Sequence, residues 1–145
     1  MRAGERMLGL DFGERRIGVA ASDPLGITAQ VVTVIERGSL AEDVAAIGEI
    51  AEKRGAGKIV LGLPLNMDGS VGPQARRVRR FAGRLRRELG MEVVLWDERL
   101  STVEAERVLV EADESRSARR QVRDGVAAAV ILQSYLEAQR RSEAQ

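Results

Sequence analysis

Three short apolar segments follow one another near the start of this chain, with only a few residues between them. The joins contain turn formers, glycine in the first and a Pro24–Gly26 turn in the second. Apolar segments of this length with short, turn-forming joins are typical of consecutive antiparallel strands. We therefore expect a three-stranded meander whose strands cover Met7–Phe12, Arg16–Ala21 and Ala29–Ile35, with residues Gly13–Arg16 at the first join.

Beyond the meander the apolar spacing changes to an alternation of helical and strand periods. Ser39 followed three residues later by Glu42 is the pattern of a capping box, which marks the start of a helix. Gly55 and Gly90 stand where two helical patterns end. The expected elements are a helix from Ser39 to Gly55, a strand over Lys58–Leu63, a helix from Pro73 to Gly90 and a strand over Glu92–Trp96.

Two more helices are expected towards the end of the chain. Ser101 with Glu104 predicts a helix to about Ala112, and a later apolar stripe predicts a helix over Val122–Gln139. Between them, Ala112–Gln121 is polar and has no apolar stripe, so we expect no regular element there. A meander followed by βαβ units predicts an α/β fold. Its mixed five-stranded sheet has three antiparallel and two parallel strands, flanked by helices.

The 145 residues suit a single domain, residues 1–145, and they include no cysteine and no histidine. Disulfides, thiolate nucleophiles, thiolate zinc sites and histidine general bases are therefore excluded. Any catalysis must use carboxylates, hydroxyls, arginine, lysine, backbone amides or a bound hard cation. Oxygen ligands suit Mg²⁺ and Mn²⁺ best, so the composition favours a carboxylate site for one of these ions.

The net charge is only +1, but the arginines are concentrated in two segments. Pro73–Leu89 holds seven arginines against one acid, and Ser115–Arg123 holds four arginines and no acid. The Arg76–Arg87 helix can be a solvated outer face or a phosphate-binding face. The excess of one sign favours phosphate contact, which predicts that binding weakens steeply with salt.

Nothing in the sequence suggests a membrane protein. The first six residues lead into an apolar stretch broken by Asp11, and no apolar run approaches the roughly 18 residues of a membrane span. We expect no signal peptide, no membrane association and a cytoplasmic location.

Asp11 is an unusual residue for a buried strand. Strand alternation places it on the same face as Gly9 and Gly13, so space is left on both sides of its carboxylate. That space would admit metal ions and a phosphate backbone. The alternative is that Asp11 bonds the amides of the hairpin turn.

Three other acids stand at the ends of predicted elements. Asp97 and Glu98 follow a buried strand, and Asp124 lies where the last helix is expected to begin. Each can be a helix cap, but together with Asp11 they can also surround one site at the strand ends. Carboxylates that close repel one another unless a divalent cation lies between them. Two such ions support phosphodiester hydrolysis without histidine.

Four blocks of the sequence resemble the YqgF, or RuvX, family, whose bacterial members act on pre-16S ribosomal RNA and are also proposed to resolve Holliday junctions. The likeness covers nearly the whole chain in order and spacing. It implies a ribonuclease H-like fold, a metal-dependent nuclease, and catalytic and metal-binding roles for Asp11, Glu98 and Asp124. The blocks are GLDFGERRIGVAASD (Gly9–Asp23), GLPLNMDGS (Gly62–Ser70), DERLSTVEAE (Asp97–Glu106) and DGVAAAVILQSYL (Asp124–Leu136).

Candidate substrate contacts lie in or beside these blocks and in the second basic segment. The Asn66–Ser70 loop can offer backbone amides to a phosphate or be a plain connection between a strand and a helix. The candidates are Arg15, Arg16, Asn66, Asp68, Gly69, Ser70, Arg99, Ser101, Thr102, Arg119, Arg120 and Arg123.

Three functions remain open on the sequence. The first is an endonuclease that matures the 5′ end of pre-16S ribosomal RNA, and the second is a nuclease of branched DNA that uses the same site. The third is a nucleic-acid-binding factor without turnover. With four aromatic residues in mostly core-like positions, we expect the backbone and shape of structured RNA or branched DNA to be read. A homodimer is left open.

Overall fold

The structure is a computed structural model, and it describes residues 6–101 and 116–144. Its strands form a five-stranded sheet in the order β3-β2-β1-β4-β5. The first three strands pair antiparallel, and β4 and β5 extend the sheet in parallel with β1. The mixed sheet expected from the sequence is therefore confirmed. The strands are β1 (Arg6–Phe12), β2 (Arg16–Ser22), β3 (Ala29–Glu36), β4 (Ala56–Leu63) and β5 (Glu92–Asp97).

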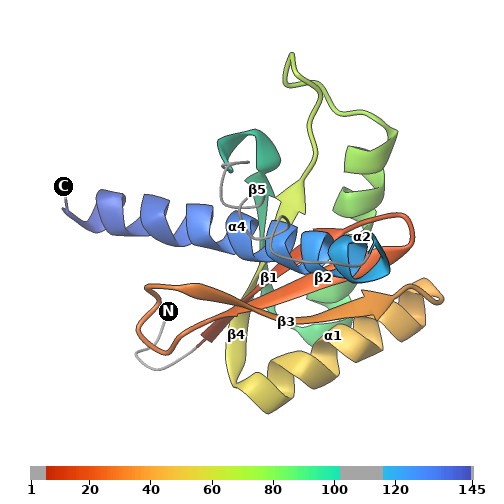
Figure 1. The fold of residues 1–145 in the computed structure, drawn as a ribbon, viewed down its shortest axis with the longest axis horizontal. Helices are drawn as coiled ribbons and strands as arrows, with labels where there is room; N and C mark the ends of the chain where they lie inside the picture. The colour runs from red at the N-terminus through yellow and green to blue at the C-terminus, as the bar shows by residue number, and fades with distance from the viewer. Residues whose placement is uncertain (1–5, 102–115, 145) are drawn as a thin grey trace.

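Helices cover both faces of this sheet (Figure 1). On one face α1 (Leu40–Arg54) and α2 (Pro73–Leu89) close the larger core. On the other face the long helix α4 (Arg116–Ala144) crosses the strands and closes a smaller core. A short 3₁₀ helix, η1 (Glu98–Leu100), follows β5. The two cores bury β1, β2 and β4 on both sides, which explains the nearly continuous apolar sequences of these strands.

The alternation predicted for β1 determines which residues enter which core. Leu8, Leu10 and Phe12 are buried under α1 and α2, whereas Met7 lies in the core under α4. Gly9 shares the face of Met7, and a Cβ placed there would lie 2.6 Å from the Cβ of Leu132. Glycine is thus required where α4 packs closely on β1. Asp11 follows on this same face.

The ends of α1 and α2 follow the local signals in the sequence. Ser39 and Glu42 form the reciprocal capping box, with the Glu42 amide 3.1 Å from the Ser39 hydroxyl. Gly55 and Gly90 end the two helices in the left-handed region, with φ of 66° and 64°. Pro73 opens α2, where a missing amide hydrogen costs no helical bond. These boundaries were predicted correctly.

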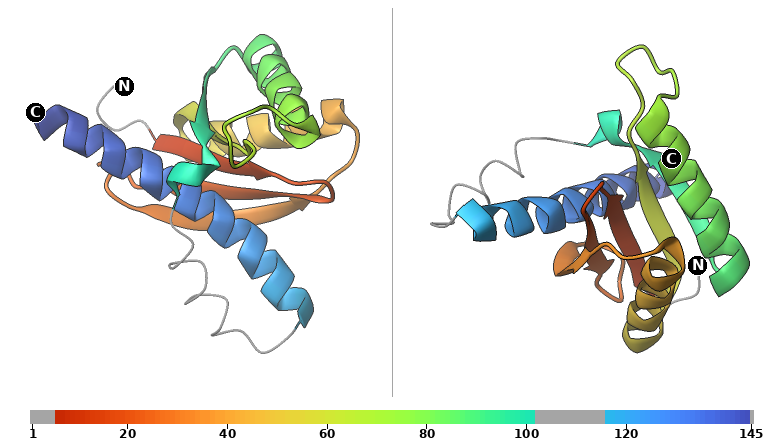
Figure 2. Two further views of the ribbon diagram at one scale, coloured as in Figure 1. Left: turned by 90° about the horizontal axis from the view of Figure 1, so that it is seen from above. Right: turned by 90° about the vertical axis from the view of Figure 1, so that its right-hand side faces the viewer.

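The last helix differs from its prediction. It begins at Arg116 instead of about Val122 and ends at Ala144 instead of about Gln139. The polar stretch expected to be irregular is thus helical from residue 116, and Figure 2 shows the first turns of α4 extending beyond the sheet. A helix that leaves the sheet has no core to face there, so its sequence need not carry an apolar stripe. The helix predicted from Ser101 to Ala112 falls outside the described residues, apart from Ser101 itself.

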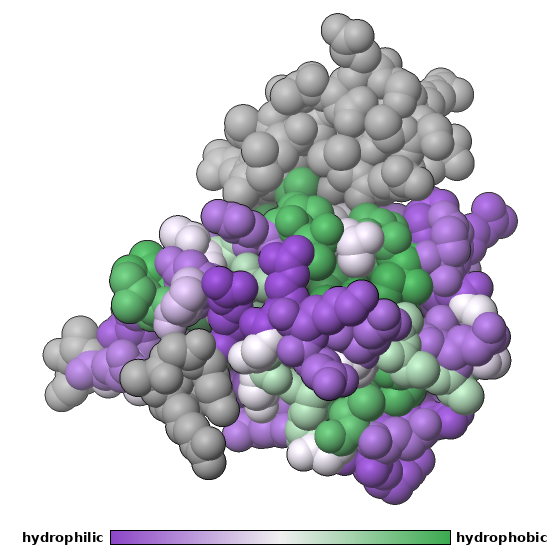
Figure 3. All heavy atoms as spheres, turned by 90° about the horizontal axis from the view of Figure 1, so that it is seen from below, coloured by the Kyte–Doolittle hydropathy of each residue, from purple (hydrophilic) through white to green (hydrophobic). Residues whose placement is uncertain are grey.

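No helix in the described part of the chain is long and apolar enough to cross a membrane. The surface seen in Figure 3 carries mostly hydrophilic side chains with separate apolar areas between them. Large apolar side chains that are exposed in the described residues are Leu25, Ile27, Val31, Met67 and Leu100.

Candidate active site

Asp11 lies near the carboxyl end of β1, and β1 lies between β2 and β4 in the sheet. Its partner on β2 is Gly18. On the other side, Leu10 pairs with Leu61 of β4, so Asp11 and Gly62 follow in step on the two parallel strands. Adjacent strands are about 4.8 Å apart. The partly buried Asp11 therefore has a residue without a side chain on each side.

Glu98 approaches this position from the side of β4. It is the first residue of η1, and a Cβ placed at Gly62 would lie 3.0 Å from its Oε2 atom. The carboxylate of Glu98 therefore lies over Gly62, beside Asp11. Asp97 has a different role, because its side chain accepts hydrogen bonds from the backbone and guanidinium of Arg99. Asp97 caps η1, while the helix expected from Ser101, which Asp97 or Glu98 could have capped, lies outside the described residues.

Asp124 approaches from the side of β2. A Cβ placed at Gly18 would lie 1.9 Å from the carbonyl oxygen of Asp124, so the glycine allows α4 to touch the sheet beside Asp11. Asp124 is inside α4, eight residues after Arg116, and the alternative that it caps the start of this helix is wrong. Its carboxylate Oδ2 instead accepts a 2.7 Å hydrogen bond from Nε of Arg16.

Arg16 links two carboxylates at the start of β2. Besides Asp124, its guanidinium faces Glu36, with Nη1 and Oε1 3.8 Å apart. The hydrogen bond to Asp124 raises the pKa of Arg16, opposed in part by burial. The sequence places Arg16 beside Asp11 as a substrate contact but gives no sign that it pairs with Asp124. The pairing depends on how α4 crosses β2, which no local pattern records.

The oxygen-rich chemistry of this face suits a hard divalent cation, because the carboxylate of Glu98 lies over Gly62 and the backbone carbonyl of Asp124 lies over Gly18. Within residues 6–101 and 116–144, however, no three acidic side chains meet closely enough to hold one ion as they stand. Asp124 is held by its hydrogen bond from Arg16. The assignment of Asp11, Glu98 and Asp124 as a metal-binding set therefore stays a prediction.

The Asn66–Ser70 loop closes on itself through hydrogen bonds. The amide of Asn66 donates to the carbonyl of Ser70 at 2.9 Å, and the amide of Gly69 donates to the carbonyl of Asn66 at 2.8 Å. Asp68 accepts from both the amide and the hydroxyl of Ser70, at 2.9 and 2.6 Å, which lowers its pKa. Arg99 joins the loop to η1, since its Nη1 donates to the carbonyl of Met67 at 3.2 Å.

The other predicted substrate contacts are spread around this end of the sheet or lie outside the description. Arg15 is exposed in the β1–β2 turn, and Arg123 is exposed on α4. The hydroxyl of Ser101 donates to the carbonyl of Glu98 at 2.6 Å and so braces η1. Thr102 and the side chains of Arg119 and Arg120 lie outside the described residues.

The arginines of α2 lie behind the sheet, on the face opposite Asp11. The first turn of this helix still reaches the carboxyl end of β1, where Gln74 donates to the carbonyl of Phe12 at 2.9 Å. Beside it is a cavity of about 110 Å³ lined by Phe12, Leu40 and the arginines 37, 77 and 80. Only the first half of α2 therefore lies near the end of the sheet where Asp11 and Glu98 are found.

Comparison with known proteins identifies relatives over most of the chain. Residues 5–138 match the model of the RuvX family, described as a Holliday junction resolvase. A protein of Myxococcus xanthus named "Putative pre-16S rRNA nuclease" is 56% identical over 93% of this chain and 89% of its own length. A protein of the same name from Moorella thermoacetica is 57% identical over 91% of this chain and 94% of its own length.

Solved structures with a similar fold are more distant in sequence. RuvC of Thermus thermophilus, in complex with a Holliday junction, matches with a TM-score of 0.60 and 12% identity over 93% of this chain and 96% of its own. The yeast mitochondrial resolvase Ydc2 matches with a TM-score of 0.58 and 11% identity, over 99% and 82%. These structures confirm the ribonuclease H-like fold. With the family match over nearly its whole length, the chain belongs to the RuvX (YqgF) family of nucleases.

Proposed function

We propose that this protein is a metal-dependent endonuclease that hydrolyses phosphodiester bonds in structured RNA, and that its substrate is the 5′ end of pre-16S ribosomal RNA. The observation that carries the proposal is the position of Asp11 between Gly18 and Gly62, with Glu98 over one glycine and α4 over the other. The names of the relatives support the choice of RNA. This role would place the protein in the cytoplasm.

In this proposal Asp11, Glu98 and Asp124 would hold Mg²⁺ or Mn²⁺, which supplies Lewis acidity for phosphodiester hydrolysis. The two glycines let α4 and Glu98 approach the sheet closely on either side of Asp11. Arg16 holds the carboxylate of Asp124 ready at the rim of the site and offers a positive charge to an incoming phosphate. The acids of this face repel an unneutralised phosphate at the position of the cut, so cleavage depends on the cation.

The test incubates the full chain with a precursor RNA fragment and with a four-way DNA junction, in Mg²⁺, Mn²⁺ or chelator. Asp11→Asn keeps the size of the side chain and removes its charge. We expect it to abolish cleavage and to retain nucleic-acid binding. Asp23→Asn is the matched control, because Asp23 lies in the β2–β3 turn at the opposite end of the sheet. It should cleave at the wild-type rate.

The same experiment separates the alternatives. Faster cleavage of the DNA junction than of the RNA would favour the second function, a branched-DNA nuclease, which the RuvX family description suggests. Binding without cleavage under every metal condition would favour a non-catalytic binding factor. Undiminished cleavage by the Asp11→Asn variant would exclude the proposed site.

A further inference from the structure

Met67 is the most exposed large apolar side chain in the described part of the chain, with 96% of its surface accessible. It lies in the loop between β4 and α2, which projects beyond the sheet at the end where Asp11 lies (Figures 1 and 2). Leu100, 58% exposed on η1, lies at the same end. A single exposed apolar residue is common on protein surfaces. Exposure alone therefore decides nothing, and the surroundings of Met67 carry the argument.

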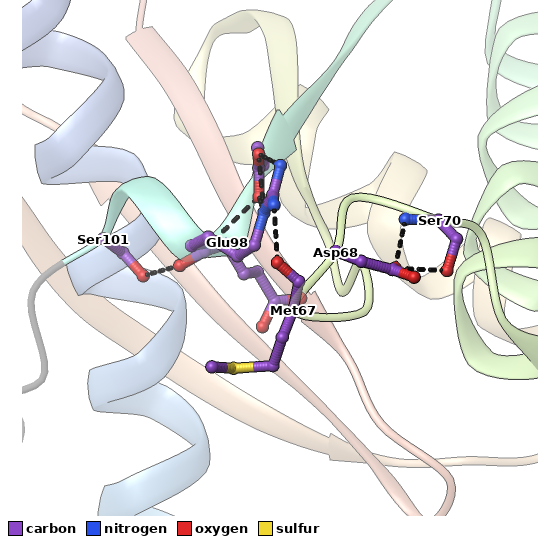
Figure 4. A network of polar contacts seen from close by, with 7 residues as sticks. Met67, Asp68, Ser70, Glu98 and Ser101 are labelled. Carbon is purple, nitrogen blue, oxygen red and sulfur yellow. Dashed lines mark hydrogen bonds and ion pairs between the residues drawn. The ribbon is translucent and has the colours of Figure 1, made fainter.

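The loop that carries Met67 is held in one shape. Two hydrogen bonds join Asn66 to Ser70. One runs between their backbones, and in the other the side-chain amide of Asn66 donates to the hydroxyl of Ser70 at 2.9 Å. Gly69 turns the chain in the left-handed region, with φ of 86°. Figure 4 shows Asp68 directed towards Ser70, while the side chain of Met67 points away from this network. The polar groups of the loop therefore bond one another, while the apolar side chain of Met67 is left exposed to solvent.

A second set of bonds fixes this tip relative to the proposed catalytic acid. Nη1 of Arg99 donates to the carbonyl of Met67 at 3.2 Å, and its Nε and Nη2 contact the carboxylate of Asp97 at 3.1 and 2.8 Å. Arg99 is the residue after Glu98 in η1. The backbone of Met67 is therefore clamped to the same turn that places Glu98 over Gly62.

Within the described residues, no aromatic side chain is available for a base at this site. Phe12, Phe81 and Tyr135 are buried, and the partly buried Trp96 donates its indole hydrogen to Ser134. Apolar side chains such as methionine and leucine can instead be wedged against or between bases and unstack them. The thioether of methionine is flexible and polarisable, which suits it to bases of any sequence.

We propose that Met67 is a wedge that packs against an unpaired or branch-point base of a structured nucleic acid, next to the bond that is cut. The inference rests on the proposed nuclease function and adds how the protein selects non-duplex structure. Rigid mounting on η1 keeps the base contact at a constant position relative to Glu98. A duplex offers no unpaired base to Met67, so the protein would bind a duplex through contacts with its phosphate backbone alone.

The test measures binding to a four-way DNA junction and to an RNA hairpin with an unpaired 5′ extension, each against a fully paired duplex of equal length. EDTA prevents cleavage, and 2-aminopurine at the branch point or first unpaired position reports unstacking by its fluorescence. We expect Met67→Ala to weaken binding to at least one branched probe about 3- to 10-fold. It should also lose the fluorescence rise, with duplex binding changed less than about twofold. A response confined to one probe identifies RNA or DNA as the substrate of the wedge.

Two further variants control the test. Met67→Leu keeps an apolar tip and should restore binding, whereas Leu25→Ala truncates a residue that is 81% exposed at the opposite end of the sheet and should change nothing. Equal losses on branched and paired probes, or an unchanged fluorescence rise in Met67→Ala, would overturn the wedge. If the wild-type protein binds and cleaves but Met67→Ala is indistinguishable from it, the wedge alone fails. If the wild-type protein binds neither nucleic acid, the proposed function fails as well.

Discussion

Arg16 and Arg15 are neighbours with opposite surroundings. Arg16 is held between Asp124 and Glu36, with its side chain 23% exposed, while Arg15 is exposed in the turn. A hydrogen bond between charged, partly buried groups contributes more to stability than an exposed ion pair. We therefore expect Arg16→Gln to lower the free energy of unfolding by more than Arg15→Gln does. Arg15→Gln should change it by less than about 0.5 kcal/mol.

Urea denaturation of both variants measures this difference. The same comparison bears on the proposed site, because the pair holds the carboxylate of Asp124, a proposed metal ligand. Equal unfolding free energies for the two variants would show that the Arg16–Asp124 pair does not hold α4 on β2.

Asp97 makes the stability of the folded protein depend on pH in the acid range. Its hydrogen bonds with Arg99 hold the pKa of Asp97 below its ordinary value of 3.8. A depressed pKa in the folded state means that the unfolded chain binds the proton first. Its contribution to stability is thus complete above about pH 4 and is lost as the pH falls through the folded pKa. Asp68 and Asp23 act in the same direction, through bonds from Ser70 and Ile27.

Asp97→Asn should therefore lose less stability than the wild-type protein between pH 7 and pH 3. Unfolding free energies at a series of pH values in this range provide the measurement. Parallel curves for the two proteins would mean that Arg99 does not clamp Asp97 in solution.

At the level of elements, the contact between α4 and β2 leaves no space for a side chain at Gly18, not even for the single carbon atom of alanine. A Cβ at Gly18 would meet the carbonyl oxygen of Asp124 at 1.9 Å, and backbone cannot move aside cheaply. We expect Gly18→Ala to displace α4, destabilise the protein by about 1–3 kcal/mol and abolish cleavage. Melting temperature and the precursor-cleavage rate are the two measurements.

Gly83 in α2 is the matched control for this substitution. A Cβ there would meet only the end of the Arg87 side chain, at 3.5 Å. Alanine is also the better helix former, so Gly83→Ala should stabilise the protein by about 0.5–1 kcal/mol. A Gly18→Ala variant as stable and active as Gly83→Ala would show that α4 does not depend on this close approach.

The elements that bury an apolar face could be predicted from the sequence, because burial imposes a period. Alternation placed Leu8, Leu10 and Phe12 correctly, and the capping box of Ser39 fixed the start of α1. The start of α4 could not be predicted in the same way. Its first turns extend past the sheet, where no core demands a stripe.

For the site, the sequence identified acids and glycines but not their partners. The approach of Glu98 to Gly62 and of α4 to Gly18 depends on crossings between elements far apart in the chain. The pairing of Arg16 with Asp124 spans 108 residues and leaves no local signal. Periodicity gives the face on which a side chain lies, while tertiary packing decides which groups on that face meet.

At the level of the whole molecule, a net charge of +1 conceals an uneven distribution. The first half of α2 reaches the end of the sheet that carries Asp11, whereas its last turn lies beside β5 at the other end, where Arg86 donates to the carbonyl of Val93. Phosphate contacts made by arginines near the site should release counterions on binding. Arg80→Gln should therefore reduce the slope of log affinity against log salt by about 1.

Arg87→Gln is the control on the same helix, since it removes the same charge from an exposed arginine in the last turn. It should leave the salt slope unchanged. Affinity for the precursor RNA measured over a range of KCl concentrations provides both slopes. A wild-type slope in both variants would mean that α2 is a solvated face, as the sequence also allowed.

Gly9 and Gly18 are the two positions in β1 and β2 where the missing side chains let α4 pack closely on the sheet. Because the carbonyl oxygens of Ala128 and Asp124 and the Cβ of Leu132 lie against these glycines, the height of the helix above β1 and β2 is set mainly by the backbone of α4. The opposite layer, under α1 and α2, can consequently exchange its residues over evolutionary time without shifting the alignment of Asp124 with Asp11. The geometry of the proposed site is thus protected from changes in the larger core.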